Sequence, residues 1–264
     1  ASPEEAAAKA TKFAQKNLNL KAIADNISLE GALFGRWSTG DVNARCESAL
    51  HVAHPFTVHE QEAQTDFFAT VDDLRKVGAG YVQPAEITSG LYYHYSVLDV
   101  PQLVSNLEGC PREAWTEADG RLTAEVIRRW IMTSATVSPT GKRTQTAAYA
   151  WADLVVLEIG DDQPHSYANA WRTPAQNSRL DVAVGQLNRW LDGFDQYAEP
   201  ENRRLFAGTD PQLAVHGAQR LTLRQLAEAA AAVAPKGMPR TTASKAEVVQ
   251  LDKKPARKGR RKAA

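Results

Sequence analysis

Two stretches of alternating apolar residues, separated by a long polar segment, constrain the fold of this chain more than any other feature. Apolar side chains alternate over residues 49–58 and again over residues 87–97, which is the period of half-buried β-strands. The segment between them, residues 59–86, is much longer than the roughly 2–5 residues of a tight hairpin loop. Connections of this length in compact domains usually carry function or are disordered, so we expect a functional element here.

The rest of the sequence mixes helical and strand patterns. Capping residues and one-sided apolar spacing predict helices at residues 2–17, 21–25, 100–107, 124–134 and around 180–191, and a last helix that begins at Thr222 and is capped by Gln225. Further strands are expected at residues 27–40 and 153–159, with a turn at residues 138–146 between them. We expect the helix at Thr222 to be the partner of the helix before it. Strands mixed with segregated helices predict the α+β class.

Charge is distributed unevenly along the chain although the totals balance. The 31 Lys and Arg residues offset the 31 Asp and Glu residues, and a hydrophobic content of 43% is sufficient for a buried core. Residues 251–264 hold seven cations and one anion, so the rest of the chain has a net charge of −6. Any contact of the body with a polyanion must therefore be local. We expect a core over residues 1–240 and a basic, disordered tail over residues 241–264.

The cysteines and the beginning of the sequence bear on the compartment. Cys46 and Cys110 lie far apart without CxxC pairing, which fits a reducing cytoplasm and gives neither a disulfide framework nor a zinc signature. No segment approaches the roughly 20 apolar residues of a membrane span, and the first residues do not form a secretory signal. We expect a cytoplasmic protein without a membrane partner. The absence of an initiator Met indicates that its natural beginning is missing.

Histidines suggest a metal site, but their spacing argues against one. His51, His54 and His59 are close in sequence, yet strand alternation directs His51 and His54 to opposite faces. The HExxH pattern of zinc peptidases is also absent, so ordinary strand histidines are favoured. The GxSxG, Walker and GxGxxG motifs are absent as well, and nucleophilic hydrolysis, nucleotide hydrolysis and dinucleotide chemistry therefore lack their usual marks.

Two pairs of residues could contact a nucleic acid. Phe67 and Phe68 stand side by side in the polar segment, where an exposed ring could meet a base or one ring could fill the core. Lys142 and Arg143 follow Gly141 in the predicted turn, where a backbone that approaches closely could let them grip phosphate. From the residues alone, solvated turn cations are the favoured interpretation of the second pair.

Several segments resemble one known family in the same order along the chain. They are ALFGRWSTG, ALHVAHPFTVHE, DFFATVDDL, ITSGLYYHYSVLD, SPTGKRTQTAAYA and DQPHSYANAW, and they span residues 29–171. The chain is similar in these segments to the type I-E CasC (Cse-four) family, which forms the multi-copy backbone of the CRISPR surveillance complex Cascade. Members of that family begin with a further stretch, on the order of a hundred residues, that this chain lacks.

The resemblance implies a fold and a set of partners. It implies a ferredoxin-like, RRM-related antiparallel sheet whose N-terminal part is missing here, with added helices and a long β-hairpin thumb over about residues 59–86. Copies of such a subunit stack head to tail along a CRISPR guide RNA, contact other Cascade subunits, and present the guide in segments for pairing with target DNA.

The resemblance also implies site residues. The thumb of the family wedges over the guide and displaces one nucleotide, and its wedge positions correspond to Phe68, Ala69 and Val82. Trp37 occupies a position that approaches the displaced base in the family. An apolar wedge suits a device that must accept any guide sequence, since unstacking bases costs a few kcal/mol per step and stacking is blind to sequence.

These expectations describe an RNA-binding scaffold without catalysis, cofactor or metal. The alternative is a backbone subunit that cleaves target RNA with a divalent metal held by a thumb aspartate, for which Asp66, Asp72 or Asp73 would serve. Aspartates are also common in turns, where they bond the backbone. An RRM-like protein outside CRISPR systems is a weaker alternative, because no aromatic string of the KGFGFV type is present.

Overall fold

The computed structural model describes residues 28–37, 45–61, 63–71, 79–137, 147 and 149–236, without the side chains of Phe68, Val71, Ala79, Gly80 and Asn177. The helices expected at residues 2–17 and 21–25, the turn at 138–146 and the basic tail lie outside the described residues. The helices are α2 (Leu29–Phe34), α3 (Val100–Glu108), α4 (Arg121–Thr136), α6 (Leu180–Ala198) and α7 (Leu223–Ala231), with short 3-10 helices η2 (Arg112–Glu117), η3 (Tyr167–Trp171) and η4 (Gln176–Ser178). The strands are β1 (Leu50–Val52), β2 (Phe56–Thr57), β3 (Ala63–Val71), β4 (Ala79–Thr88), β5 (Tyr92–Tyr93), β6 (Ser96–Leu98), β7 (Leu154–Ile159), β8 (Arg203–Gly208) and β9 (Ala218–Arg220).

The strands form four small sheets rather than one. β1 pairs with β6, β2 with β5 and β3 with β4, all antiparallel, while β7, β8 and β9 form a three-stranded sheet in which β9 runs parallel to β8. Helices and small, mostly antiparallel sheets agree with the predicted α+β class. The predicted single ferredoxin-like sheet is not confirmed by the described residues.

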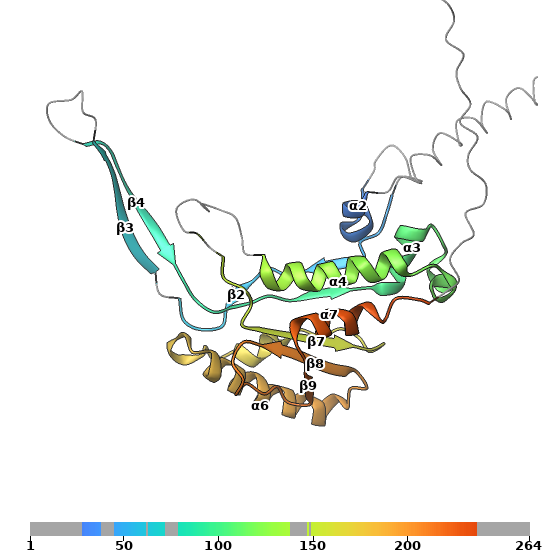
Figure 1. The fold of residues 1–264 in the computed structure, drawn as a ribbon. Helices are drawn as coiled ribbons and strands as arrows, with labels where there is room; N and C mark the ends of the chain where they lie inside the picture. Colours follow the sequence, from blue (N-terminus) through green and yellow to red (C-terminus); the bar gives the residue numbers. More distant parts are fainter. Residues whose placement is uncertain are drawn as a thin grey trace, which may run out of the picture.

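The β7–β8–β9 sheet is the centre of the body, and helices cover both of its faces (Figure 1). Successive residues of β8 alternate between two cores: Leu205 packs in one cluster with Leu226 of α7 and Ile131 of α4. Phe206 packs on the other face with Leu187 and Leu191 of α6. This alternation follows from the two-residue period of a strand, and it explains why β8 is apolar on both faces.

Four sequence-predicted helices are confirmed, α3, α4, α6 and α7, and two of them begin at side-chain caps. Asp99 caps α3 by accepting a hydrogen bond from the Gln102 N–H, and Thr222 and Gln225 form the predicted capping box of α7. The expected pairing of α7 with the preceding helix is wrong, because α7 packs against α4 and an Arg128–Glu228 ion pair of 2.7 Å links the two. α6 lies across the sheet from them (Figure 1).

The strand predicted over residues 27–40 is wrong, because its first part is the helix α2. The Ser28 hydroxyl accepts a hydrogen bond from the Gly31 N–H, which caps the helix at its beginning. Gly35, at a positive φ of 79°, ends it. Ala32 and Leu33 are buried, so the apolar residues of this stretch serve one helical turn instead of one face of a strand.

The two alternating stretches that frame the long segment are strands, each in two pieces. Residues 50–52 and 56–57 are separated at Pro55, which has no N–H to donate to a ladder. Their partners β6 and β5 are likewise separated by His94 and Tyr95. The predicted long element between these strands is the hairpin β3–β4. None of the helices in the described part of the chain is long and apolar enough to cross a membrane.

Candidate nucleic-acid interface

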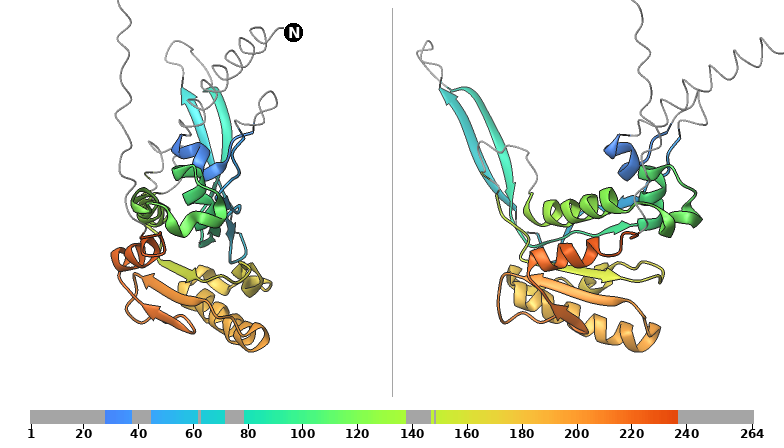
Figure 2. Two further views of the ribbon diagram at one scale, coloured as in Figure 1. Left: turned by 90° about the vertical axis from the view of Figure 1, so that its right-hand side faces the viewer. Right: turned by 45° about the vertical axis from the view of Figure 1, so that its right-hand side comes forward.

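The β3–β4 hairpin projects away from the body of the molecule (Figures 1 and 2). Its strands pair in antiparallel register from Ala63 opposite Thr88 to Thr70 opposite Tyr81, with an irregularity at Val71. All described side chains of the two strands are exposed except that of Ala85, which is half-buried. A two-stranded sheet alone is marginally stable in water, so an extended hairpin of this kind is suited to a surface that a partner covers.

One face of the hairpin is apolar near its middle. The register places Phe67 opposite Pro84 and Ala69 opposite Val82, and residues two apart on a strand share a face. Phe67 is 73% exposed and Val82 is 58% exposed. We call Phe67, Ala69, Val82 and Pro84 the apolar row. Exposed apolar surface of this size on a projecting element indicates a contact with another molecule.

The alternate pairs of the hairpin form a more polar row. They are Gln64 with Ile87, Asp66 with Ala85, Phe68 with Gln83, and Thr70 with Tyr81. The Tyr81 hydroxyl and the Gln83 side chain are hydrogen-bonded along this row. The predicted wedge residues Ala69 and Val82 are therefore direct partners. Phe68 belongs to the neighbouring pair, opposite Gln83, and its side chain lies outside the described residues.

Pro84 is compatible with the register of the apolar row. Proline lacks an N–H, so it fits only a pair whose backbone groups point away from the partner strand. The Phe67–Pro84 pair is therefore of the non-hydrogen-bonded type, in which facing side chains approach most closely. Phe67, which the sequence left undecided beside Phe68, is the aromatic residue that shares a face with Ala69 and Val82. The two-residue spacing of Phe67 and Ala69 is the sequence signal for this assignment.

The foot of the hairpin is tied to the body through Tyr93. Its ring lies 4.9 Å from the Trp171 ring and 5.4 Å from the Phe56 ring, measured between centroids. Its hydroxyl accepts a hydrogen bond of 2.9 Å from the Tyr167 N–H and lies 3.2 Å from the Ser166 hydroxyl. Burial raises the pKa of Tyr93, so the hydroxyl stays protonated and can also donate.

Trp37 lies far from the apolar row of the same molecule. Its segment directly follows α2, and α2 and the hairpin lie at opposite ends of the body (Figure 1). The indole is 77% exposed, and the Arg45 guanidinium stacks over its ring at 4.5 Å from the centroid. The Trp37 segment and the apolar row therefore do not form one compact site within a single molecule.

The structure does not place the remaining predicted residues in the apolar row. Lys142, Arg143, Asp72 and Asp73 lie outside the described residues. Asp66 is exposed in the polar row of the hairpin. Within the described ranges, no three His, Cys, Asp or Glu side chains are grouped as a metal site would require. Both cysteines are free thiols.

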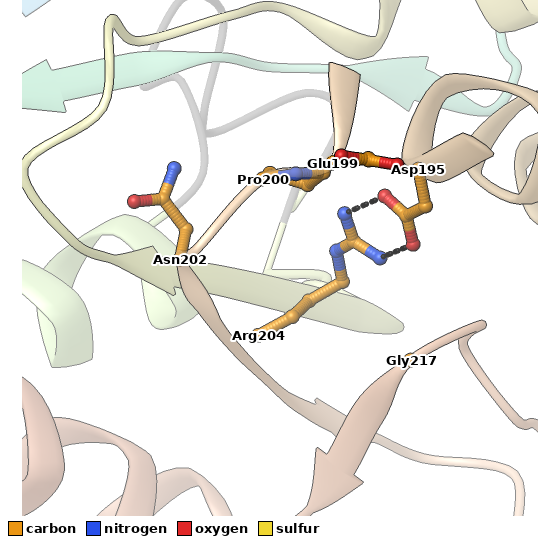
Figure 3. A pocket seen from close by; sticks show the side chains of 6 residues that line it. All are labelled: Asp195, Glu199, Pro200, Asn202, Arg204 and Gly217. Atoms are coloured by element: carbon orange, nitrogen blue, oxygen red, sulfur yellow. Dashed lines mark hydrogen bonds and ion pairs between the residues drawn. The ribbon is translucent and has the colours of Figure 1, made fainter. Parts of the chain in front are cut away.

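A pocket of about 350 Å³ on the body is lined by charged residues of α6 and β8 (Figure 3). The Arg204 guanidinium donates two hydrogen bonds of 2.9 Å to the Asp195 carboxylate and others to Glu158 and to the His216 carbonyl. These bonds with Arg204 lower the pKa of Asp195. The charges of Arg204 and Asp195 are thus committed to pairing α6 with the sheet, which is a structural role.

Similar solved structures come from RNA-guided assemblies. One is a chain of a "CRISPR RNA-guided surveillance complex, pre-nicking", with 26% identity and a TM-score of 0.67; the match covers 79% of this chain and 56% of that one. Another belongs to a "CRISPR RNA-guided surveillance complex", with 24% identity, a TM-score of 0.67 and 81% of each chain covered. This chain therefore spans a little over half the length of the first of these relatives. No curated protein matches it.

The fold thus defines a Cas protein of the Cascade type. More particularly, the model of the CT1975-like protein family matches residues 1–232, which is most of the chain. The chain belongs to the CT1975-like family. This agrees with the coarser part of the sequence resemblance, which placed the chain among the subunits of Cascade.

Proposed function

We propose that this chain is the guide-binding backbone subunit of a type I-E Cascade complex, acting in antiviral defence in the cytoplasm. The observation that carries the proposal is the apolar row, which is exposed on a hairpin that projects from the body. In the proposed complex the hairpin is the thumb and the body belongs to a ferredoxin-like, RRM-related core. The apolar row separates neighbouring guide bases, since unstacking requires apolar contact area and no sequence reading.

The positions of Trp37 and the hairpin favour repeated copies along the RNA. Because α2, which directly precedes the Trp37 segment, and the hairpin lie at opposite ends of the body, we propose that a nucleotide displaced by the hairpin of one copy meets Trp37 of a neighbouring copy. A contact of this head-to-tail kind joins different surfaces and need not close into a ring. Such a filament suits one subunit that covers a long guide. Lys142 and Arg143 would supply phosphate contacts.

The role we propose is to hold and present RNA, and cleavage of paired target DNA falls to another protein. Asp66 points from the hairpin without a described metal-binding neighbour, and Asp72 and Asp73 follow it in sequence. An assembled complex incubated with complementary RNA and Mg²⁺ separates the alternatives. Ordered cuts that Asp66→Ala, Asp72→Ala or Asp73→Ala abolishes would make the subunit a nuclease, and intact RNA supports the scaffold.

The direct test of the proposal is the nucleic acid that the subunit retains. We expect the chain, purified with the other Cascade subunits and a CRISPR array, to retain a discrete guide-sized RNA and to bind DNA complementary to that guide. Recovery of the assembled protein with no RNA, or with RNA of every length in proportion to its abundance, would contradict it.

A further inference from the structure

A buried histidine lies at the foot of the hairpin. His59 is only 5% exposed, whereas His51 and His54 beside it in sequence are exposed. Imidazole rings are polar on both edges, so a ring buried to this degree needs partners for both nitrogens. The partners identify what the residue does.

Both nitrogens of His59 bond to the backbone. The Leu91 N–H donates to Nε2 over 3.0 Å, which requires an unprotonated Nε2. The proton is therefore on Nδ1, which donates to the Glu60 carbonyl over 2.6 Å. The Ser178 hydroxyl lies 3.3 Å from the same Nδ1.

These bonds join the two legs of the hairpin to each other. Glu60 leads into β3, and Leu91 follows the end of β4, so a single side chain bridges the strand that leaves the body and the strand that returns. Gly90 passes so close to the ring that a Cβ at this position would overlap Nε2. The contact therefore depends on both residues.

The same residue joins the hairpin to the body. His59 forms a parallel bridge with Ala175, and the Ala175 N–H donates to the Val58 carbonyl over 2.8 Å. Val58 and Ala175 are buried in one cluster with Ala183 of α6. The imidazole thus sits where both legs of the hairpin meet the segment that precedes α6.

We infer that His59 is a positioning residue that fixes the angle of the hairpin relative to the body. The functional part of this inference rests on the proposed thumb role. β3 alone has 9 residues, so the hairpin is a lever of about 30 Å. A tilt of about 10° at its foot would move the tip by about 5 Å and the apolar row by about half as much, which is comparable with the roughly 3.4 Å rise between stacked bases. An angle held this closely is necessary if the apolar row is to enter between two bases.

The test measures the angle on the full chain, without RNA. Spin labels at Thr70→Cys near the tip of the hairpin and Arg189→Cys on α6, in a Cys46→Ser, Cys110→Ser background, report their distance distribution by pulsed electron resonance. We expect one narrow distribution for the parent and one about twofold broader for His59→Leu, since an unanchored hairpin samples several tilts. His59→Gln can return an amide oxygen to the place of Nε2 and is expected to restore a narrow distribution.

Gly90→Ala provides a second route that keeps the histidine. The added methyl group displaces the ring from Leu91, so the distribution should broaden as in His59→Leu, with the folded body retained by circular dichroism. A distribution as narrow as that of the parent in folded His59→Leu or Gly90→Ala would overturn the inference.

A separate measurement on assembled complexes distinguishes this inference from the proposed function. In complexes that contain His59→Leu or Gly90→Ala, we expect guide RNA to be retained while target-DNA binding falls about tenfold. His59→Gln is expected to restore target-DNA binding. A narrow distance distribution in the variants refutes the positioning role of His59, whether or not guide RNA is retained. Parent complexes that contain no guide RNA refute the proposed function, whatever the distance distribution is.

Discussion

The β3–β4 hairpin and the β7–β8 pair of the body are both antiparallel pairings rich in apolar residues, yet they have opposite surroundings. β8 is covered on both faces by helices, and Leu205, Phe206 and Ala207 are buried. The hairpin has no such cover, and Phe67 and Val82 face solvent. Apolar burial stabilises the body, so its apolar residues are explained by the fold. Burial does not explain the exposed apolar residues of the hairpin, and we therefore assign them to the binding of another molecule.

The largest expected effect on stability is at Arg204, in the body. Arg204→Leu leaves the carboxylates of Asp195 and Glu158 without their buried partner, and we expect a loss of about 3–5 kcal/mol in the free energy of unfolding. Urea denaturation measures it. Arg203→Leu, on the same strand but exposed, is the matched control and should cost less than about 0.5 kcal/mol. Equal losses would show that the buried network is not what holds α6 to the sheet.

The second prediction concerns the hairpin, where we expect a loss of binding without a loss of stability. Phe67→Ala should leave the unfolding free energy within about 0.5 kcal/mol, because the ring is exposed. In assembled complexes it should weaken target-DNA binding by about 1–3 kcal/mol, the usual contribution of one stacking contact. Tyr197→Ala on α6 removes another exposed ring, 89% accessible, and should change neither quantity. A Phe67→Ala variant that binds target normally would remove Phe67 from the interface.

A smaller effect is expected at the beginning of α7. Thr222→Ala removes the hydroxyl that accepts from the Gln225 N–H, and the body should lose about 1 kcal/mol of stability. Thr222→Ser keeps the hydroxyl and serves as control. If both variants unfold at the same urea concentration, the capping box does not contribute.

The smallest effect is a dependence on pH at Asp195. The pKa of this carboxyl is lowered below its ordinary value of 3.8 by its bonds with Arg204. Because the folded-state pKa is the lower one, the stabilisation is complete above about pH 4 and is lost as the pH falls through the folded value. Urea midpoints measured between about pH 5 and about pH 2 should therefore fall less steeply in Asp195→Asn than in the parent. Equal slopes would contradict the assignment.

The sequence was informative where structure depends on neighbours along the chain. The helices α3, α4, α6 and α7 follow from capping residues and one-sided spacing, and the long segment 59–86 was correctly marked as a separate element. It failed at residues 27–40, where Ser28 and Gly35 delimit a helix whose apolar residues also suit a strand. The capping residue Ser28 and the terminating residue Gly35 favour the helix over the strand in this segment.

What the sequence could not give depends on contacts between distant residues. Strand alternation places Phe67 on the face of Ala69, but only the cross-strand register adds Val82 and Pro84 to that face. His59 was assigned as an ordinary strand histidine because its partners Leu91 and Ser178 lie 32 and 119 residues away. The packing of α7 on α4 likewise depends on contacts between residues that are far apart in the sequence.

The central claim is that the apolar row separates bases of a bound guide, and chemical probing of the guide tests it most directly. In a complex assembled with the parent chain, we predict bases of raised reactivity at a regular interval along the RNA, as displaced nucleotides require. The interval should persist in Tyr197→Ala and fade in a Phe67→Ala, Val82→Ala double variant that still retains guide. Uniform reactivity in the parent complex, or an unchanged pattern in the double variant, would contradict the account.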